Sequence, residues 1–301
     1  MQVQLVQAAN AILGEGPLWC TDEQALYWVD IIRPSVYRYT PGVGQTGVWT
    51  LPESVGCIAR LGDGRLLVAM RSGLSELSTI DGSLTRLASI EHASAQHRFN
   101  DGAVDPQGRF WVGSMREGGP SLGKLYRFGG DDDPLEIDDH WGIPNGMGWS
   151  PDGTVMYATD SAKRTIWRFA YEKDSGTPSD KRVFATFEEG VPDGLTVDAE
   201  GCVWSALWDG WRVVRLSPDG ELMSTVPMPV QRPTSVAFGG ESLQTLYVTS
   251  ATINVGNAGL TAGPLAGGLF EVETAVRGLP APAARLNANA LVRADGGEVS
   301  V

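Results

Sequence analysis

The chain has 301 residues, 38 of them glycine and 18 proline, and a formal net charge of −13 at pH 7. This acidity excludes the basic face that nucleic-acid binding requires, and it suits a soluble protein that attracts cations. No run approaches the roughly 20 apolar residues that span a bilayer, and the first residues lack the basic region and long apolar core of a signal peptide, so a cytoplasmic protein without membrane contact is expected.

Six similar units follow one another along the chain. The stretch VPDGLTVDAEGCVWSAL (residues 191–207) reads as a turn, a strand, a second turn and another strand, and Asp193 precedes the second-turn glycine, Gly201, by eight residues. The corresponding positions of the six units, at intervals of 41, 44, 45, 48 and 41 residues, are Glu15, Gly56, Asn100, Asn145, Asp193 and Thr234. A repeat of about this length, present six times, decides the fold.

Each unit is rich in strand signals. Second strands such as ALYWVD and VMYATDS are rich in Val, Tyr, Trp and Thr, and third strands such as SVYRYT alternate apolar with polar residues. Sustained helical periodicity with start and stop signals is absent, so less than about a tenth of the chain is expected to be helical. Four antiparallel strands, repeated six times around a central channel, predict an all-β, six-bladed β-propeller.

The repeat runs through nearly the whole chain without a linker, so residues 1–301 are expected to form one domain. The propeller core is predicted at about residues 10–272. The early segment QVQLVQ is expected to add an outer strand to the last blade and thereby to close the ring, because this removes two exposed sheet edges. Residues 275–301 are rich in Pro, Ala and Gly and are predicted to be an irregular C-terminal tail.

Four polar residues are predicted to meet at one mouth of the channel. The innermost strand of each blade lines a propeller channel, so Glu15, Asn100, Asn145 and Asp193 would converge from four blades. Asn or Asp before Gly is also a common turn pair, and this explains any single copy equally simply. It does not explain the shared register or Glu15. Two carboxylates and two amides without a basic residue predict a hard cation such as calcium, magnesium or manganese.

Other residues carry weaker signals. There is no GxSxG elbow, Walker motif or dinucleotide fingerprint. Of the ten tryptophans, most are expected in blade packing, whereas Trp208 and Trp211 follow a second strand where loops reach the mouth. The cysteines are expected to be reduced core residues, and the histidines lack metal-ligand spacing. These residues are Cys20, Cys57, Cys202, His92, His97 and His140.

Five motifs, taken together and in order, point to a known family. They are LGEGPLW, RFNDGAVDPQGRFWVGSM, NGMGWSPDG, VPDGLTVDAEGCVW and AGGLFEV. With them, about residues 10–272 resemble the senescence marker protein (regucalcin), gluconolactonase and luciferin-regenerating enzyme family. The resemblance implies one divalent metal in the channel, held by Glu15, Asn145 and Asp193. Calcium is the expected metal, and zinc, manganese, magnesium and iron(II) are alternatives.

The resemblance also implies a substrate site and a reaction. Arg98 and Asn100 of RFND match the family's sugar-lactone contacts, and Glu117 is the acid nearest to a further contact. Asp193 would also be catalytic, taking a proton from the attacking water. The implied activity is a metal-dependent hydrolase that opens a sugar aldonolactone, such as glucono-, arabino- or xylonolactone, to the aldonic acid.

Two other functions stay open at this point. One is a calcium-binding regulatory protein of the regucalcin type, and the other is a hydrolase of other esters or organophosphates. Arg98 and Asn100 favour the lactonase, because they supply sugar-facing groups that a calcium buffer does not need. The expected partner is a small sugar lactone, and no pattern indicates an oligomeric state.

Overall fold

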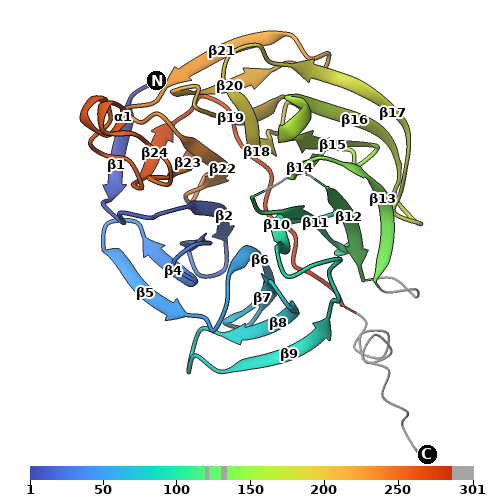
Figure 1. Cartoon of the computed structure of the whole chain (residues 1–301). Coiled ribbons are helices and arrows are strands. Elements are labelled where there is room, and N and C mark those ends of the chain that lie inside the picture. Colours follow the sequence, from blue (N-terminus) through green and yellow to red (C-terminus); the bar gives the residue numbers. More distant parts are fainter. Residues whose placement is uncertain (119–121, 130–133, 287–301) are drawn as a thin grey trace, which may run out of the picture.

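The computed structural model describes residues 1–118, 122–129 and 134–286. It contains six four-stranded antiparallel sheets, which radiate from a central channel as the blades of a propeller (Figure 1). The predicted six-bladed, nearly all-β fold is confirmed. The helical elements of the described residues are short: α1 (Asn257–Ala262) and the 3₁₀ turn η1 (Ser161–Lys163). None of the described helices is long and apolar enough to cross a bilayer.

The first five blades run from the inner to the outer strand in chain order. The first contains β2 (Gly14–Cys20), β3 (Ala25–Asp30), β4 (Ser35–Thr40) and β5 (Gly44–Thr50). The second contains β6 (Val55–Gly62), β7 (Arg65–Met70), β8 (Gly73–Ser78) and β9 (Leu84–Ser89). The third contains β10 (His97–Val104), β11 (Phe110–Arg116), β12 (Gly123–Phe128) and β13 (Leu135–Trp141). The fourth contains β14 (Pro144–Trp149), β15 (Val155–Asp160), β16 (Thr165–Glu172) and β17 (Thr177–Thr186). The fifth contains β18 (Val191–Val197), β19 (Val203–Trp208), β20 (Arg212–Leu216) and β21 (Leu222–Pro227).

The sixth blade joins the two ends of the chain. Its inner three strands are β22 (Pro233–Gly239), β23 (Thr245–Ser250) and β24 (Leu269–Glu273), and its outer strand is β1 (Val3–Gln7). β1 pairs antiparallel with β24, with Val3 opposite Val272. The prediction that the early segment closes the ring is therefore correct, and β24 is not left as a free sheet edge.

The hydrophobic core lies between the blades. β3 is buried along its whole length, and Trp28, Trp111 and Trp204, each on a second strand, are at most 1% exposed. Second strands read as continuous apolar runs because both faces of each sheet are covered by neighbouring blades. Outer strands such as β5 are partly exposed and alternate more clearly. Apolar burial between blades thus positions the inner strands around the channel.

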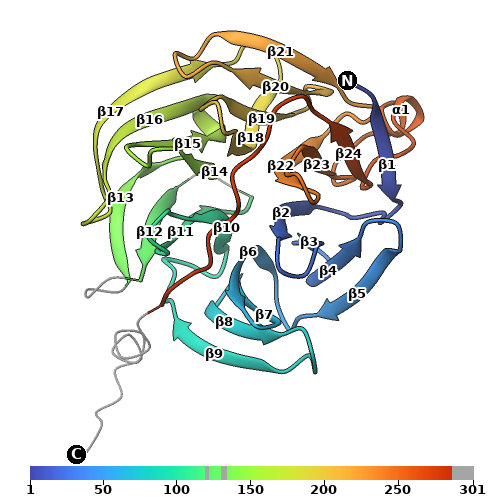
Figure 2. The same cartoon turned by 180° about the vertical axis from the view of Figure 1, so that it is seen from behind.

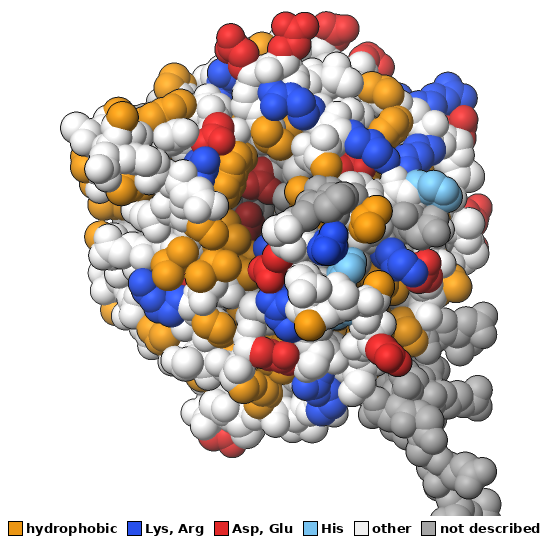
Figure 3. Space-filling view, in the orientation of Figure 1, with side chains coloured by type: hydrophobic (Ala, Val, Ile, Leu, Met, Phe, Trp, Pro, Cys, Tyr) orange, Lys and Arg blue, Asp and Glu red, His pale blue; other side chains and the backbone are white. Residues whose placement is uncertain are grey.

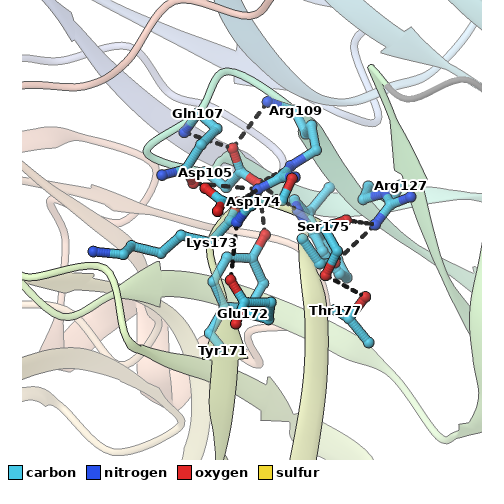
Figure 4. Close-up of polar contacts among 12 residues, drawn as sticks. Asp105, Gln107, Arg109, Arg127, Tyr171, Glu172, Lys173, Asp174, Ser175 and Thr177 are labelled. Carbon is cyan, nitrogen blue, oxygen red and sulfur yellow. Dashed lines mark hydrogen bonds and ion pairs between the residues drawn. The ribbon is translucent and has the colours of Figure 1, made fainter.

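Buried acids tie neighbouring blades together away from the channel. Asp105 is fully buried after β10, where its carboxylate accepts hydrogen bonds from the Arg109 Nε (2.5 Å) and the Tyr171 hydroxyl (2.5 Å) of the fourth blade (Figure 4). Arg127 donates to the carbonyls of Ser175 and Gly176 at 2.7 and 2.8 Å. These hydrogen bonds from Arg109, Tyr171 and Arg127 hold the β16–β17 hairpin against the third blade.

The segment 275–286 crosses the propeller on the face shown in Figure 2. It contains no helix or strand, but hydrogen bonds hold it at both ends. The Arg277 carbonyl accepts from the Ala199 N–H of the fifth blade (2.8 Å), and the Ala284 N–H donates to the Arg60 carbonyl of the second (2.7 Å). The predicted irregular tail therefore begins as a strap across the channel. Its remainder, residues 287–301, lies outside the described residues.

Candidate active site and metal centre

Every inner strand carries a β-bulge at the corresponding position of its unit. These six positions, called the ring positions below, are Glu15, Gly56, Asn100, Asn145, Asp193 and Thr234. In the fourth blade, Pro144 pairs with Asp160 and Met147 with Ala158, so three residue steps on β14 oppose two on β15. The same one-residue excess occurs at the matching place in the other five blades. Bulges bend a strand and re-aim its side chains, and they are frequent beside active sites. The repeat therefore encodes six aligned bulges around one channel mouth.

The bulge corrects one expectation from the sequence. The Pro-Asp-Gly stretch is not a turn before the strand, because Asp193 and Gly194 lie inside β18. The glycine serves blade packing instead. A Cβ on Gly194 would lie 2.0 Å from the Ser235 Oγ of the next blade, and a Cβ on Gly146 would lie 2.2 Å from the Leu195 nitrogen. Adjacent inner strands approach this closely only where a side chain is missing.

Four predicted site residues come from four blades and are buried. Glu15, Asn100, Asn145 and Asp193 are 6%, 7%, 6% and 5% exposed. The Asn145 Nδ2 donates hydrogen bonds to the Asp193 carboxylate and to the Ser161 Oγ, the latter at 3.1 Å. Figure 3 shows a hollow at the centre of the face opposite the strap, with acidic side chains at its floor and hydrophobic side chains on its wall. The structure thus brings Asn145 and Asp193 into direct contact.

Two buried aspartates set the position of the ring residues. Asp160 ends β15 and accepts a hydrogen bond from the Ile143 N–H (3.1 Å), two residues before Asn145. Asp30 ends β3 and accepts one from the Leu13 N–H (3.2 Å), also two residues before its ring position. Both aspartates are 0% exposed. Asp30 and Asp160, the last residues of the motifs YWVD and YATD, therefore fix where β2 and β14 enter the channel.

Three carboxylates crowd the channel with little positive charge to offset them. Burial raises the pKa of Glu15 and of Asp193 well above their ordinary values, and repulsion from neighbouring carboxylates raises both further. Burial also raises the pKa of a third acid, Asp101, to about 6. Arg98 is the cation that acts against these shifts in Glu15 and Asp193. This surplus of negative charge in a low-dielectric site favours a bound cation.

Asp101 was missed from the sequence because strand alternation places it on the opposite face from Asn100. The bulge between Phe99 and Gly102 breaks that alternation. Asp101 is 9% exposed and lines the channel below the ring. The signal that could have found it is the pair of successive polar residues in RFND, at the place where three other units carry Gly16, Gly146 and Gly194.

The residues present fit a divalent metal ion. The Asn145 Oδ1 is buried and accepts no hydrogen bond, although the Nδ2 of the same amide has two partners. The amide of this orphaned oxygen contacts the Asp193 carboxylate, which in turn lies within electrostatic reach of Glu15. Amide and carboxylate oxygens are the donors that hard cations take. In the described part of the chain no group of three or more His, Cys, Asp or Glu side chains is arranged to hold a metal. Metal binding would therefore depend on the amide oxygen of Asn145 together with Glu15 and Asp193.

The remaining ring positions connect blades. The Asn100 Oδ1 accepts from the Arg98 Nη1 (2.8 Å), and its Nδ2 donates to the Pro144 carbonyl (3.0 Å). The Thr234 Oγ1 donates to the Gly14 carbonyl at 2.5 Å and so joins the sixth blade to the first. Asn100 thus orients Arg98, and its own contact with substrate stays a prediction.

Arg98 and Glu117 form the polar side of the site. Arg98 is 5% exposed, and its Nε donates to the Glu117 Oε1 at 2.9 Å. Glu117 follows β11 and receives a second bond, 2.8 Å long, from the Arg71 Nη2. Burial alone would raise the pKa of Glu117, but the hydrogen bonds from the two arginines outweigh it and hold that pKa below its usual value. Arg71 was not found from the sequence, since nothing in its spacing marks it.

A cavity of about 370 Å³ lies between the ring and the strap. Asp101, Gly16 and Ser235 line its upper part, and the strap residues Leu279–Pro282 line its far side. Apolar side chains make up much of the wall. The channel therefore continues beneath the carboxylates, and the chain's own C-terminal strap lies across it.

The two singled-out tryptophans have different surroundings. Trp208 lies opposite Val191 in the β18–β19 register, and its ring is stacked 4.4 Å from the Arg232 guanidinium carbon. Arg232 is in turn held by the Asp209 carboxylate at 2.6 Å. Trp211 packs against Gly263. Trp208 thus belongs to the mouth end of the fifth blade, whereas Trp211 contacts the segment that follows α1.

The expectations for cysteines agree with the structure. All three are buried and none forms a disulfide. Burial raises the pKa of the Cys20 thiol to about 12 and raises that of Cys57 well above its usual value. Such thiols are neutral at physiological pH and are poor nucleophiles.

Comparison with known proteins gives consistent matches over nearly the whole chain. Residues 13–252 match the family described as SMP-30/Gluconolactonase/LRE-like region. A 6-deoxy-6-sulfogluconolactonase of Pseudomonas putida is 38% identical over 279 residues, which cover 90% of this chain and 94% of the relative. A pentonolactonase of Haloferax volcanii is 37% identical over 289 residues, 93% of this chain and 97% of the relative. Regucalcin of Gallus gallus is 32% identical over 290 residues, which cover 93% of this chain and 97% of the relative.

Solved structures show the same likeness in three dimensions. A luciferin-regenerating enzyme superposes with a TM-score of 0.89 at 31% identity and covers 95% of this chain and 99% of its own. A calcium-binding regucalcin from Agrobacterium tumefaciens superposes with a TM-score of 0.90 at 29% identity, covering 95% and 98%.

Proposed function

The chain belongs to the SMP-30/gluconolactonase/LRE-like family, and from this premise we propose that it is a metal-dependent hydrolase that opens a sugar aldonolactone to the aldonic acid. Two similar proteins are named for lactonase activity, one on a 6-deoxy-6-sulfogluconolactone and one on a pentonolactone. The proposal for this chain covers glucono-, arabino- and xylonolactone as candidate substrates.

The observation that carries the proposal is the orphaned Oδ1 of Asn145, whose amide contacts the buried Asp193 carboxylate. Arg98 and Glu15 are also buried, and both interact electrostatically with that carboxylate. Buried acceptors usually have a hydrogen-bond partner, and a bound cation would supply one here. Metal binding by Glu15, Asn145 and Asp193 gives the oxygen a partner, and Arg98 supplies hydrogen-bond donors for a polar ligand. Calcium is the first expectation because all the ligand atoms are oxygens.

The chain's own residues supply the remaining chemistry. When bound, a divalent cation acts as a Lewis acid towards the lactone carbonyl and towards water. Asp193 accepts the proton of the attacking water while the new C–O bond forms, and the ring C–O bond then breaks. The departing ring oxygen takes up that proton, so the product is the open hydroxy acid. Asn145 Nδ2 orients the Asp193 carboxylate, and Arg98 orients the sugar and stabilises the developing oxyanion.

The test is lactone hydrolysis followed as acid release with a pH indicator, with spontaneous ring opening subtracted. Gluconolactone, arabinolactone and xylonolactone are compared with and without a chelator. We expect turnover above the spontaneous rate, its loss on chelation and its return with calcium, zinc, manganese, magnesium or iron(II).

Two outcomes would contradict the proposal in different ways. Tight calcium binding without turnover of any lactone would favour the calcium-binding regulatory role, to which the similarity with regucalcin also points. Turnover of simple esters or organophosphates in place of lactones would move the activity to that hydrolase class.

A further inference from the structure

Arg71 connects two blades at the mouth of the site. It directly follows β7 in the second blade and is 31% exposed. Its Nη1 donates to the carbonyls of Ala95 (2.8 Å) and His97 (3.0 Å), and its Nη2 donates to the Glu117 Oε2 (2.8 Å). One side chain therefore fixes both the entry to β10 and the acid that follows β11. Guanidinium groups suit this task because their donors lie in one rigid plane.

Glu117 is held between two arginines by different oxygen atoms. Its Oε1 accepts from the Arg98 Nε at 2.9 Å and its Oε2 from the Arg71 Nη2 at 2.8 Å. Its own N–H donates to the Gln96 carbonyl at 2.9 Å, so the backbone is fixed as well. Because each oxygen has a separate arginine partner, Glu117 pairs with Arg98 through a single bond and not through two.

Arg98 keeps one donor group available as a consequence. Its Nε binds Glu117, and its Nη1 donates to the Phe99 carbonyl (2.9 Å) and to the Asn100 Oδ1 (2.8 Å). Within the described residues its Nη2 donates no hydrogen bond. The guanidinium is planar, so fixing Nε and Nη1 also fixes the direction of Nη2. An oriented Nη2 with two N–H groups, on a residue that is 5% exposed, is available to contact a polar ligand.

We propose that Arg71 is a positioning residue, which holds the Glu117 Oε2 and thereby keeps the Arg98 Nη2 free for the sugar lactone. This inference rests on the proposed function. Arginine and carboxylate favour a paired contact with two parallel hydrogen bonds. Without Arg71, the Oε2 of Glu117 is released and turns to the Arg98 Nη2, which removes the donor that faces the ligand.

The first test is steady-state kinetics of Arg71→Met with calcium present. Methionine keeps much of the aliphatic volume but removes every donor. We expect kcat/KM for the best lactone to fall about tenfold, with KM raised and kcat lowered together, because the Arg98 Nη2 contact that orients the sugar and stabilises the oxyanion is lost. Arg71→Lys should recover part of the lost activity. Lysine restores the positive charge but not the planar set of donors that contacts Glu117 and the two carbonyls together.

A matched control lies in the same blade. Arg86 is 39% exposed and donates to the Ser72 Oγ at 2.6 Å, away from Glu117. Arg86→Met should leave KM unchanged. A change in Arg86→Met as large as that in Arg71→Met would overturn the inference, because the effect would then come from lost charge or stability in general.

A double-mutant cycle tests whether Arg71 acts through Glu117. If it does, Arg71→Met combined with Glu117→Gln should have the KM of Glu117→Gln alone. Additive effects would overturn the inference and would instead indicate that Arg71 acts through the backbone carbonyls of Ala95 and His97.

A readout independent of turnover separates this inference from the proposed function. The Glu117 carboxyl is titrated by ¹³C NMR in wild type and in Arg71→Met, and its pKa should rise in the variant because one arginine is lost. An unmoved pKa overturns the inference even in an active enzyme. A wild type that opens no lactone overturns the proposed function, whatever the titration shows.

Discussion

Asp193 and Arg98 have separable tasks in the proposed site, and single substitutions distinguish them. Asp193→Ala should abolish turnover even with excess metal, because loss of a general base alone costs about a hundredfold to ten-thousandfold. Arg98→Ala should keep its metal content and Tm while losing turnover through poor substrate orientation. Acid release, metal analysis and thermal unfolding measure these effects. Full activity in Asp193→Ala would contradict its role as general base. Full activity in Arg98→Ala would contradict its role in binding the sugar.

The buried carboxylates predict a pH dependence for the metal-free protein. Burial raises the pKa of Glu15 and Asp193 well above the ordinary range and that of Asp101 to about 6. Groups whose pKa is raised on folding contribute stability that is complete below their unfolded pKa of about 4 and is lost as the pH rises through the folded value. With a chelator present, Tm should therefore fall as the pH rises from about 4 through about 6, the pKa of Asp101.

Two comparisons check the origin of that fall. Asp101→Asn should flatten the decline in the chelated protein, because the amide does not ionise. Calcium should reduce the decline in wild type by compensating the negative charge. A Tm that increases with pH under chelation would contradict the predicted charge surplus.

The bulged inner strand is the element on which the site depends. Each bulge requires close contact with the next inner strand, and Gly194→Ala would place a Cβ 2.0 Å from the Ser235 Oγ. We expect a loss of about 1–3 kcal/mol in the free energy of unfolding, together with weaker metal binding, since Asp193 is the preceding residue. Gly256→Ala, where an added Cβ meets nothing within 4 Å, is the control. Equal stability in the two variants, measured by denaturant unfolding, would show that the blades do not need this contact.

The strands were predictable because each blade repeats the same turn and apolar pattern, and the ring residues because they share one register. Asp101 could not be predicted, because the orientation of its side chain would be inferred from strand alternation and the bulge interrupts that alternation. Arg71 was missed for a different reason. Its task depends on a long side chain crossing from one blade to another, and no local pattern records that contact.

The strap acts on the whole molecule, since it links blades on opposite sides of the channel. Removal of residues 275–301 should lower Tm, because it uncovers the cavity and breaks the hydrogen bonds to Ala199 and Arg60. Gly278→Val should act in the same direction, because an added Cβ would lie 2.1 Å from the Phe238 Cβ. Differential scanning fluorimetry measures both. Wild-type Tm in both variants would show that the strap contributes nothing to stability.

The pairing of β1 with β24 also governs when the protein can finish folding. The first five blades are built from neighbouring hairpins, so each can form as soon as its own segment leaves the ribosome. The sixth blade needs the first strand made and the last, which are separated by nearly the whole chain. Closing so long a loop is slow, and until then a nascent ring exposes two sheet edges to other chains. A circular permutant of residues 1–274 that begins at Ala8 and carries residues 1–7 behind β24 would make the final pairing local. It should refold faster than the unpermuted chain of residues 1–274 at equal protein concentration.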